Sequence, residues 1–175
     1  GRENFSKIRS PFIIISNHIS FYDSFLFRLA LGFITPHLPL RFVAVNLFKW
    51  KVLNFLSSLG IIDFIYLIFG VFVIVPGQGI DKNLAGAIKI INDGGNVVMY
   101  PEGEIVIGGE IAPFKKGSAV LAQRTGAEVI PVTFNKKVGK YFRDEIIINI
   151  GEIIEVSKSE LIGDIVNRFR EKIVE

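Results

Sequence analysis

The sequence predicts an α/β fold with a mostly parallel or mixed central β-sheet that is flanked by helices. Short apolar runs alternate along the chain with amphipathic segments, which is the pattern of strands connected by helices. Glycine and proline close several of these runs, as expected where buried strands and helices end. The 175 residues suffice for one substantial core, so we expect residues 1–175 to form a single domain.

The individual elements follow from the same pattern. We expect strands over 12–16, 40–45, 71–75, 97–100, 129–134 and 145–150, the last with an extension to 155 left open. Helices are expected over 23–31, 84–92, 117–125 and 157–174. Ser157 and Glu160 form a capping-box pattern that would open the last helix. Pro131 inside a strand indicates an edge position or a bulge.

The segment 52–75 is unusually apolar. It is a run of 24 residues with one charge, Asp63, and 17 of the residues are Leu, Ile, Val or Phe. Hydropathy permits a membrane span, but a single span would separate His18 from Glu102, which we expect to share a site. The alternatives are a core helix followed by a core strand, or an interfacial or re-entrant helix around 53–69.

Composition excludes several classes of function. The chain has 20 Lys and Arg against 17 Asp and Glu, a net charge of +3. This charge is too small to indicate nucleic-acid binding, but it is compatible with binding to an anionic membrane surface. The absence of Cys excludes disulfides, thiolate-bound zinc and a Cys nucleophile. Half of the residues are hydrophobic and 16 are Phe, which favours a surface that faces lipid or a partner.

A histidine and a carboxylate follow the first strand. In the loop Asn17-His18-Ile19-Ser20-Phe21-Tyr22-Asp23, the aspartate comes five residues after the histidine and starts a helix. A turn there can bring the carboxylate to one imidazole N–H, which fixes the tautomer and leaves the other nitrogen free to accept a proton. The structural alternative is an aspartate that only caps its helix.

Two further motifs carry polar groups. The strand 97–100 runs into Pro101-Glu102-Gly103, which aims Glu102 from a second strand end. Phe114-Lys115-Lys116-Gly117 opens a helix whose free N–H groups and lysines could hold an anion. Each motif taken alone fits an ordinary solvated turn or helix start better than a functional site.

The order of these motifs is more specific than any one of them. The His-x-x-x-x-Asp loop, the Tyr-Pro-Glu-Gly turn, Phe-Lys-Lys-Gly and Val129-Ile130-Pro131-Val132 together resemble the glycerolipid acyltransferase family, best known for 1-acylglycerol-3-phosphate acyltransferases. The resemblance runs from residue 1 to about 134 and implies a membrane-associated O-acyltransferase of phospholipid biosynthesis, on the cytoplasmic face of the membrane. Family members often carry an N-terminal membrane element before the first motif, so we expect a truncated sequence.

The resemblance also implies roles for individual residues. His18 would take the proton of an acceptor hydroxyl, with Asp23 orienting it, and the oxygen would attack the thioester of acyl-CoA or acyl-carrier protein. Glu102 and Gly103 would position the lipid acceptor, an apolar groove would hold the acyl chain, and no cofactor or metal is implied. The expected substrate-binding residues are Asn17, Glu102, Gly103, Lys115 and Lys116.

Two positions depart from the family pattern. Arginines usually follow the second-motif strand and the Pro-Glu-Gly turn, where they bind the acceptor phosphate. This chain has Val75-Pro76 and Glu104-Ile105 there. Lys115, Lys116 or Arg124 would have to substitute, although lysine offers a point charge and not a bidentate fork. We therefore expect an acceptor that is not recognised through a phosphate monoester in the usual way.

Three other functions compete with acyl transfer. The lost arginines favour a catalytically silent lipid-binding module on the same fold, but an intact His18 and Asp23 disfavour it. A hydrolase or thioesterase would use water in place of the acceptor; its serine mechanism would need a Gly-x-Ser-x-Gly elbow, which the sequence lacks, and release of free fatty acid without an acceptor would indicate the water-using version. A metal site from His18, Asp23 and Glu102 has little support, because the other histidine, His37, lies in a proline-flanked turn.

Overall fold

The computed structural model describes residues 1–9, 11–20, 23–24, 27, 40–45, 57–61, 64, 66–67, 70–75, 77–106, 111–137 and 145–174. Its helices of six or more residues are α1 (Arg2–Lys7), α5 (Ile80–Asn92), α6 (Gly117–Thr125) and α7 (Ile162–Val174). Its strands are β1 (Phe12–Ser16), β2 (Leu40–Val45), β3 (Val71–Ile74), β4 (Asn96–Met99), β5 (Glu128–Lys137) and β6 (Glu145–Ile150).

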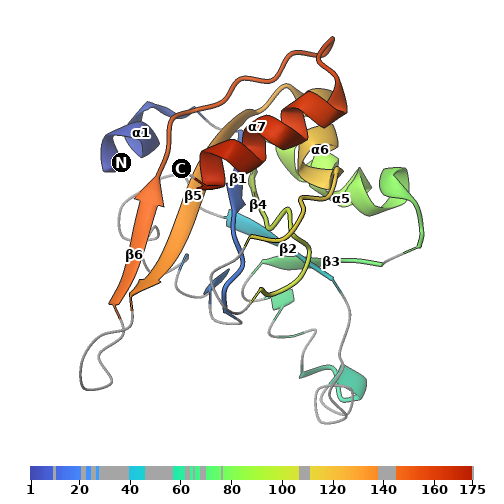
Figure 1. Cartoon of the computed structure of the whole chain (residues 1–175). Coiled ribbons are helices and arrows are strands. Elements are labelled where there is room, and N and C mark those ends of the chain that lie inside the picture. The colour runs from blue at the N-terminus through green and yellow to red at the C-terminus, as the bar shows by residue number, and fades with distance from the viewer. Residues whose placement is uncertain are drawn as a thin grey trace.

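The strands form one mixed sheet in the order β3-β2-β4-β1-β5-β6 (Figure 1). Every pairing from β3 to β5 is parallel, and β6 adds an antiparallel strand beside β5. The predicted α/β class with a mixed sheet is confirmed. β1 lies between β4 and β5, so the loop that follows β1 leaves from the middle of the sheet.

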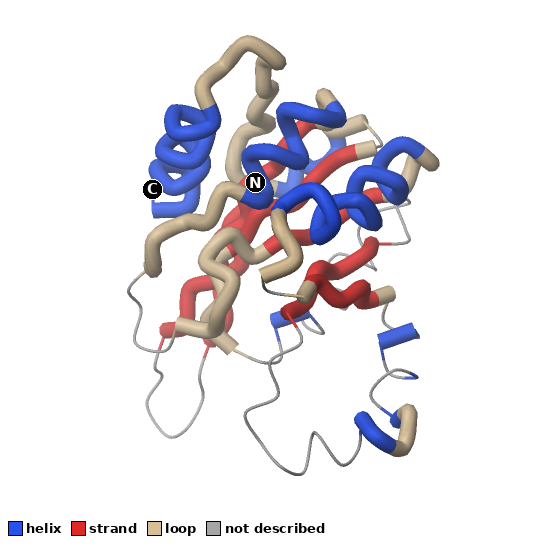
Figure 2. Tube along the Cα trace, turned by 90° about the vertical axis from the view of Figure 1, so that its right-hand side faces the viewer, coloured by secondary structure: helices blue, strands red, loops and turns tan. Residues whose placement is uncertain are grey.

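Successive side chains of β1 point to opposite faces of the sheet, and both faces are buried by other parts of the chain. Ile13 and Ile15 point to one face, where they pack with buried residues of α5, α6 and α7. Phe12 and Ile14 point to the other face, where Phe5 of α1 is among the residues that bury them. All five residues of β1 are buried, as expected of a central parallel strand. Figure 2 shows the strands running between these layers of helix and loop.

One predicted helix start is wrong, and one short helix was not predicted. The last helix begins at Ile162 and not at Ser157, because the Ser157 hydroxyl bonds to Ser159 in a turn and no capping box forms. The first helix, α1, was not expected, because its six residues show no clear helical periodicity of apolar side chains. The other predicted strands and helices that lie in the described residues agree within a few residues at each end. Only Asp23, Ser24 and Phe27 of the predicted helix 23–31 are described, and all three are helical.

Pro131 does not lie on an edge strand, because β5 is paired on both sides. Its carbonyl accepts the Gly151 N–H at 2.8 Å, on the side of the sheet away from β1. The proline nitrogen faces that same side. There the chain after β6 no longer pairs regularly with β5, and the next bridge between them joins Val129 to Ile154. The missing N–H therefore costs no bond to β1, and the irregular pairing fits the bulge that the sequence left open.

Most of the apolar segment 52–69 lies outside the described residues. Those that are described form short helical pieces within 57–67, and Leu59, Ile61, Phe64 and Leu67 are 41–73% exposed. A core helix is therefore wrong for these residues. No helix within the described ranges is both long and apolar enough to span a bilayer.

Candidate active site

Two neighbouring strand ends bring the candidate catalytic residues together. β1 ends at Ser16 and its parallel partner β4 ends at Met99, so the loops that follow them leave from the same edge of the sheet. His18 lies on the first loop and Glu102 on the second. Open α/β sheets place their ligand sites outside this carboxyl edge.

His18 and Asp23 form the predicted hydrogen-bonded pair. Nδ1 of His18 lies 2.9 Å from Oδ2 of Asp23, and the same oxygen accepts the backbone N–H groups of Ile19 and Ser20, each at 2.8 Å. Asp23 is 1% exposed and His18 is 18% exposed. An ionised carboxylate only accepts hydrogen bonds, so the imidazole carries its proton on Nδ1 and Nε2 is left as a proton acceptor.

Glu102 fixes the backbone around the histidine. Its Oε1 accepts the His18 N–H at 2.9 Å, and its Oε2 accepts the Ala112 N–H at 3.0 Å. The side chain is 1% exposed, and the His18 carbonyl in turn accepts the Val106 N–H at 2.8 Å. Because both carboxylate oxygens are engaged by backbone groups, Glu102 holds the His18 loop in register with the chain that follows β4. Its contact with an acceptor stays a prediction.

Tyr100 belongs to the site, although the sequence motifs gave it no role. Its ring stacks on the His18 imidazole with the centroids 4.1 Å apart and the planes 14° from parallel. Its hydroxyl lies 3.1 Å from Oγ of Ser24, the residue after Asp23. Burial raises the pKa of Tyr100 well above its ordinary value, and the Asp23 charge adds to this, although the bond to Ser24 opposes it. The feature of the sequence that could have indicated this role is the position of Tyr100 directly before Pro101-Glu102.

Gly103 and the lysines lie beside this cluster. Gly103 has φ +68°, and a Cβ on it would lie 2.5 Å from Nζ of Lys115, so the Lys115 side chain passes directly over the glycine. The Lys115 N–H donates to the Pro101 carbonyl at 2.8 Å, and Lys116 is the N-cap of α6. Both lysines are exposed. Arg124 lies in the last turn of α6 and pairs with Asp81 at 2.6 Å.

Asn17 has a structural partner. Its Nδ2 donates to the Phe134 carbonyl at 2.9 Å, and its Oδ1 accepts the Phe134 N–H at 2.8 Å. The side chain is buried and joins the end of β1 to β5. Because both amide atoms bond to the Phe134 backbone, Asn17 anchors the start of the His18 loop to β5. Its direct contact with substrate stays a prediction.

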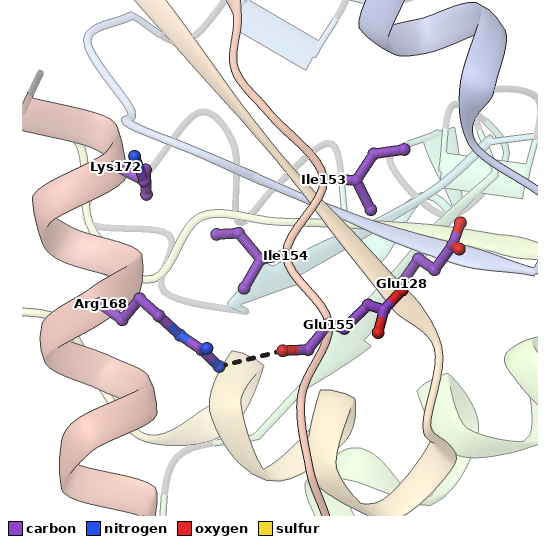
Figure 3. A pocket seen from close by; sticks show the side chains of 6 residues that line it. All are labelled: Glu128, Ile153, Ile154, Glu155, Arg168 and Lys172. Carbon is purple, nitrogen blue, oxygen red and sulfur yellow. Dashed lines mark hydrogen bonds between the residues drawn. The ribbon is translucent and has the colours of Figure 1, made fainter.

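An open depression of about 510 Å³ lies elsewhere on the protein (Figure 3). Glu128 and Arg168 are among the residues that line it, and Arg168 donates to the Glu155 carbonyl at 3.1 Å. Glu128 pairs with Phe12 at the beginning of β1, so the depression is at the edge of the sheet opposite His18. It is therefore not the predicted acyl-chain groove. Within the described ranges, no three His, Asp or Glu side chains gather as a metal-ligand set.

The fold and this site define the class of the protein. It is an α/β protein with a histidine–carboxylate pair at the carboxyl ends of its central strands, which is the arrangement that general-base catalysis uses. The chain belongs to the Acyltransferase family, whose sequence profile matches residues 1–135. The resemblance seen in the motifs is thereby confirmed.

Three relatives illustrate the match. A 1-acyl-sn-glycerol-3-phosphate acyltransferase from Borreliella burgdorferi is 30% identical over 169 residues, which cover 93% of this chain and 60% of that protein. A chloroplastic enzyme of the same name from Brassica napus is 29% identical over 76% of this chain and 35% of its own length. The crystal structure of the 1-acyl-sn-glycerophosphate acyltransferase PlsC from Thermotoga maritima has 23% identity and a TM-score of 0.64, over 99% of this chain and 69% of that chain, which confirms the fold. The chain thus spans only part of each relative.

Proposed function

We propose that this chain transfers a fatty acyl group from a thioester to a hydroxyl group of a lysophospholipid or a related lipid acceptor. The single observation that carries the proposal is the 2.9 Å bond between His18 Nδ1 and the buried Asp23 carboxylate, which prepares Nε2 as a base. The names of the relatives, 1-acyl-sn-glycerol-3-phosphate acyltransferases, support the same reaction.

The reaction proceeds without a covalent intermediate on the protein. Nε2 of His18 takes the proton of the acceptor hydroxyl while its oxygen forms a bond to the thioester carbonyl carbon. The carbon–sulfur bond then breaks, and the imidazolium returns its proton to the leaving thiolate. Asp23 stabilises the imidazolium during this cycle, and Glu102 keeps the His18 backbone in place.

We propose that the acceptor is not bound through the arginine–phosphate contacts that are usual in the family. Where the family usually carries its arginines this chain has Val75-Pro76 and Glu104-Ile105, while Lys115 lies over Gly103 next to the Glu102 turn. We assign Lys115 and Lys116 to the polar part of the acceptor. Without the bidentate contacts of the arginines the phosphate contributes less to binding, so comparable turnover of lysophosphatidic acid and a neutral lysolipid would support this assignment. Strict dependence on the phosphate would reject this assignment.

The test of the proposed reaction is an acceptor screen with labelled acyl-CoA and labelled acyl-carrier protein as alternative donors. Transfer of label to a lipid acceptor by the native chain, and a rate for His18→Ala that is lower by about 10³-fold or more, is the expected result. Equal transfer by both chains would reject the role of His18. Lipid binding without transfer by the native chain would instead establish the silent lipid-binding module, which the engaged His18–Asp23 pair disfavours.

We further propose that the apolar turn, defined as the described residues 57–61, 64, 66 and 67, docks on the membrane that holds the acceptor. Of its described side chains, Leu59 is 58%, Phe64 63% and Leu67 73% exposed. In the sequence this segment lies between β2 and β3, two neighbouring strands of the sheet. In Figures 1 and 2 it extends beyond the sheet. This surface suits the cytoplasmic leaflet that the resemblance implies.

Vesicle flotation tests the docking surface. Burying one large apolar side chain contributes about 1.5–3 kcal/mol when it is complete, so Phe64→Ser with Leu67→Ser should weaken binding to phosphatidylglycerol-containing vesicles at least about tenfold. Leu161→Ser is the matched control, because Leu161 is 72% exposed but lies next to α7, outside the apolar turn. Equal binding by the double variant and the control would reject the assignment.

A further inference from the structure

Tyr100 is held rigidly against the catalytic candidate from two directions. Its backbone precedes the Pro101-Glu102 turn, and its hydroxyl is bonded at 3.1 Å to Ser24 beside Asp23. Between these two anchors the ring lies flat on the His18 imidazole, with 4.1 Å between centroids and 14° between planes. The aromatic face and the Asp23 carboxylate therefore restrain the same imidazole from different directions.

The two restraints are not equivalent. The bond from Nδ1 to Asp23 fixes one atom of the imidazole but leaves the ring free to tilt about that bond, because the terminal torsion of histidine is broad. A ring stacked on the imidazole face removes this tilt, and so fixes the direction in which Nε2 points. The face of an aromatic ring is also electron-rich and attracts a cation that lies over it.

We propose that Tyr100 is a positioning residue, whose ring aligns Nε2 of His18 and stabilises the imidazolium that forms when His18 accepts a proton. The inference rests on the proposed function, in which His18 is the base. The hydroxyl has a different role, since it anchors the ring to Ser24, and the raised pKa of Tyr100 keeps the phenol neutral at ordinary pH. The titratable side chains that contact His18 in the described part of the chain are Asp23, Glu102 and Tyr100 itself.

Three variants distinguish the contribution of the Tyr100 ring face to catalysis from that of its hydroxyl. Tyr100→Phe keeps the face and loses the bond to Ser24, as Ser24→Ala does, and both should retain kcat within about threefold. Tyr100→Leu removes the face and should lower kcat about tenfold or more with little change in KM. It should also move the acidic limb of the pH–rate profile to lower pH by roughly half a unit to one unit, because the imidazolium loses its stabilising partner.

A second readout does not depend on turnover. The chain has 2 His residues, so the His18 resonance can be assigned by its loss in His18→Ala and titrated by NMR. We expect folded Tyr100→Leu and Tyr100→Phe to differ in this readout, because only Tyr100→Phe keeps an aromatic ring over the imidazole. Identical titration and kcat in these two variants would overturn the inference, and so would a loss in Tyr100→Phe as large as in Tyr100→Leu. Failure of the proposed function looks different, because His18→Ala would then be as active as the native chain.

Discussion

Replacing Glu102 by glutamine tests the claim that this carboxylate is a backbone clamp. In the native chain its two oxygens accept N–H groups at 2.9 and 3.0 Å, and the side chain is 1% exposed. A glutamine offers one acceptor oxygen, so its NH₂ group must face the second backbone N–H. That backbone N–H is then unsatisfied, and the one remaining bond loses the assistance of the charge.

The magnitude follows from these contacts. Each bond to a charged acceptor contributes about 1.5–3 kcal/mol, and an unsatisfied buried donor costs about 1–3 kcal/mol. Relief from burying the charge offsets part of the loss. We expect Glu102→Gln to lower the free energy of unfolding by about 2–3 kcal/mol, which for a chain of this size lowers Tm by roughly 4–12 °C.

The assay is urea unfolding followed by circular dichroism, with the slope m compared between variants to confirm that the same surface unfolds. Glu104→Gln is the matched control, since Glu104 lies two residues away and is exposed. It should change the free energy of unfolding by less than about 0.5 kcal/mol. The clamp is refuted if both variants unfold at the same urea concentration as the native chain.

Three further predictions concern other side chains of the site. Asn17→Asp keeps an acceptor for the Phe134 N–H but turns an oxygen toward the Phe134 carbonyl, so urea unfolding should show a loss of about 2–4 kcal/mol; an unchanged midpoint would contradict this. Lys115→Met should raise the acceptor KM several-fold with kcat nearly unchanged, whereas a fall in kcat alone would contradict its binding role. Because the pKa of Tyr100 is raised in the folded state, its contribution to stability is complete below the pH near 10 at which an unfolded tyrosine ionises, and falls as the pH rises above it. Absorbance at about 295 nm should show one of the 4 tyrosines ionising only with unfolding, and this late step should be missing in Tyr100→Phe.

Much of the framework could be predicted because it is encoded locally. β1, β2, α6 and β6 have the predicted bounds, since each is a continuous apolar or periodic run that ends at a clear change in composition. The bond between His18 and Asp23 could be predicted for the same reason, because the two residues are only five positions apart in one loop.

Most of the features that could not be predicted depend on contacts between distant parts of the chain. The stacking of Tyr100 on His18 and the bonds of Asn17 to Phe134 require the sheet order, which no local pattern specifies. Pro131 suggested an edge because a missing N–H usually means a missing neighbour, whereas here the neighbour is present and locally irregular. Ser157 and Glu160 had the right spacing for a cap, but their hydrogen bonds go to other groups.

The clamp on the histidine loop has a consequence for biosynthesis. The groups that fix His18 come late in the chain: Glu102 follows it by 84 residues, and the Phe134 backbone that anchors Asn17 follows Asn17 by 117. A nascent polypeptide that has left the ribosome only as far as β3 contains the base and its aspartate but none of these anchors. The geometry of the proposed active site therefore forms late in translation, after most of the sheet has emerged, and premature termination products carry the motif without this geometry.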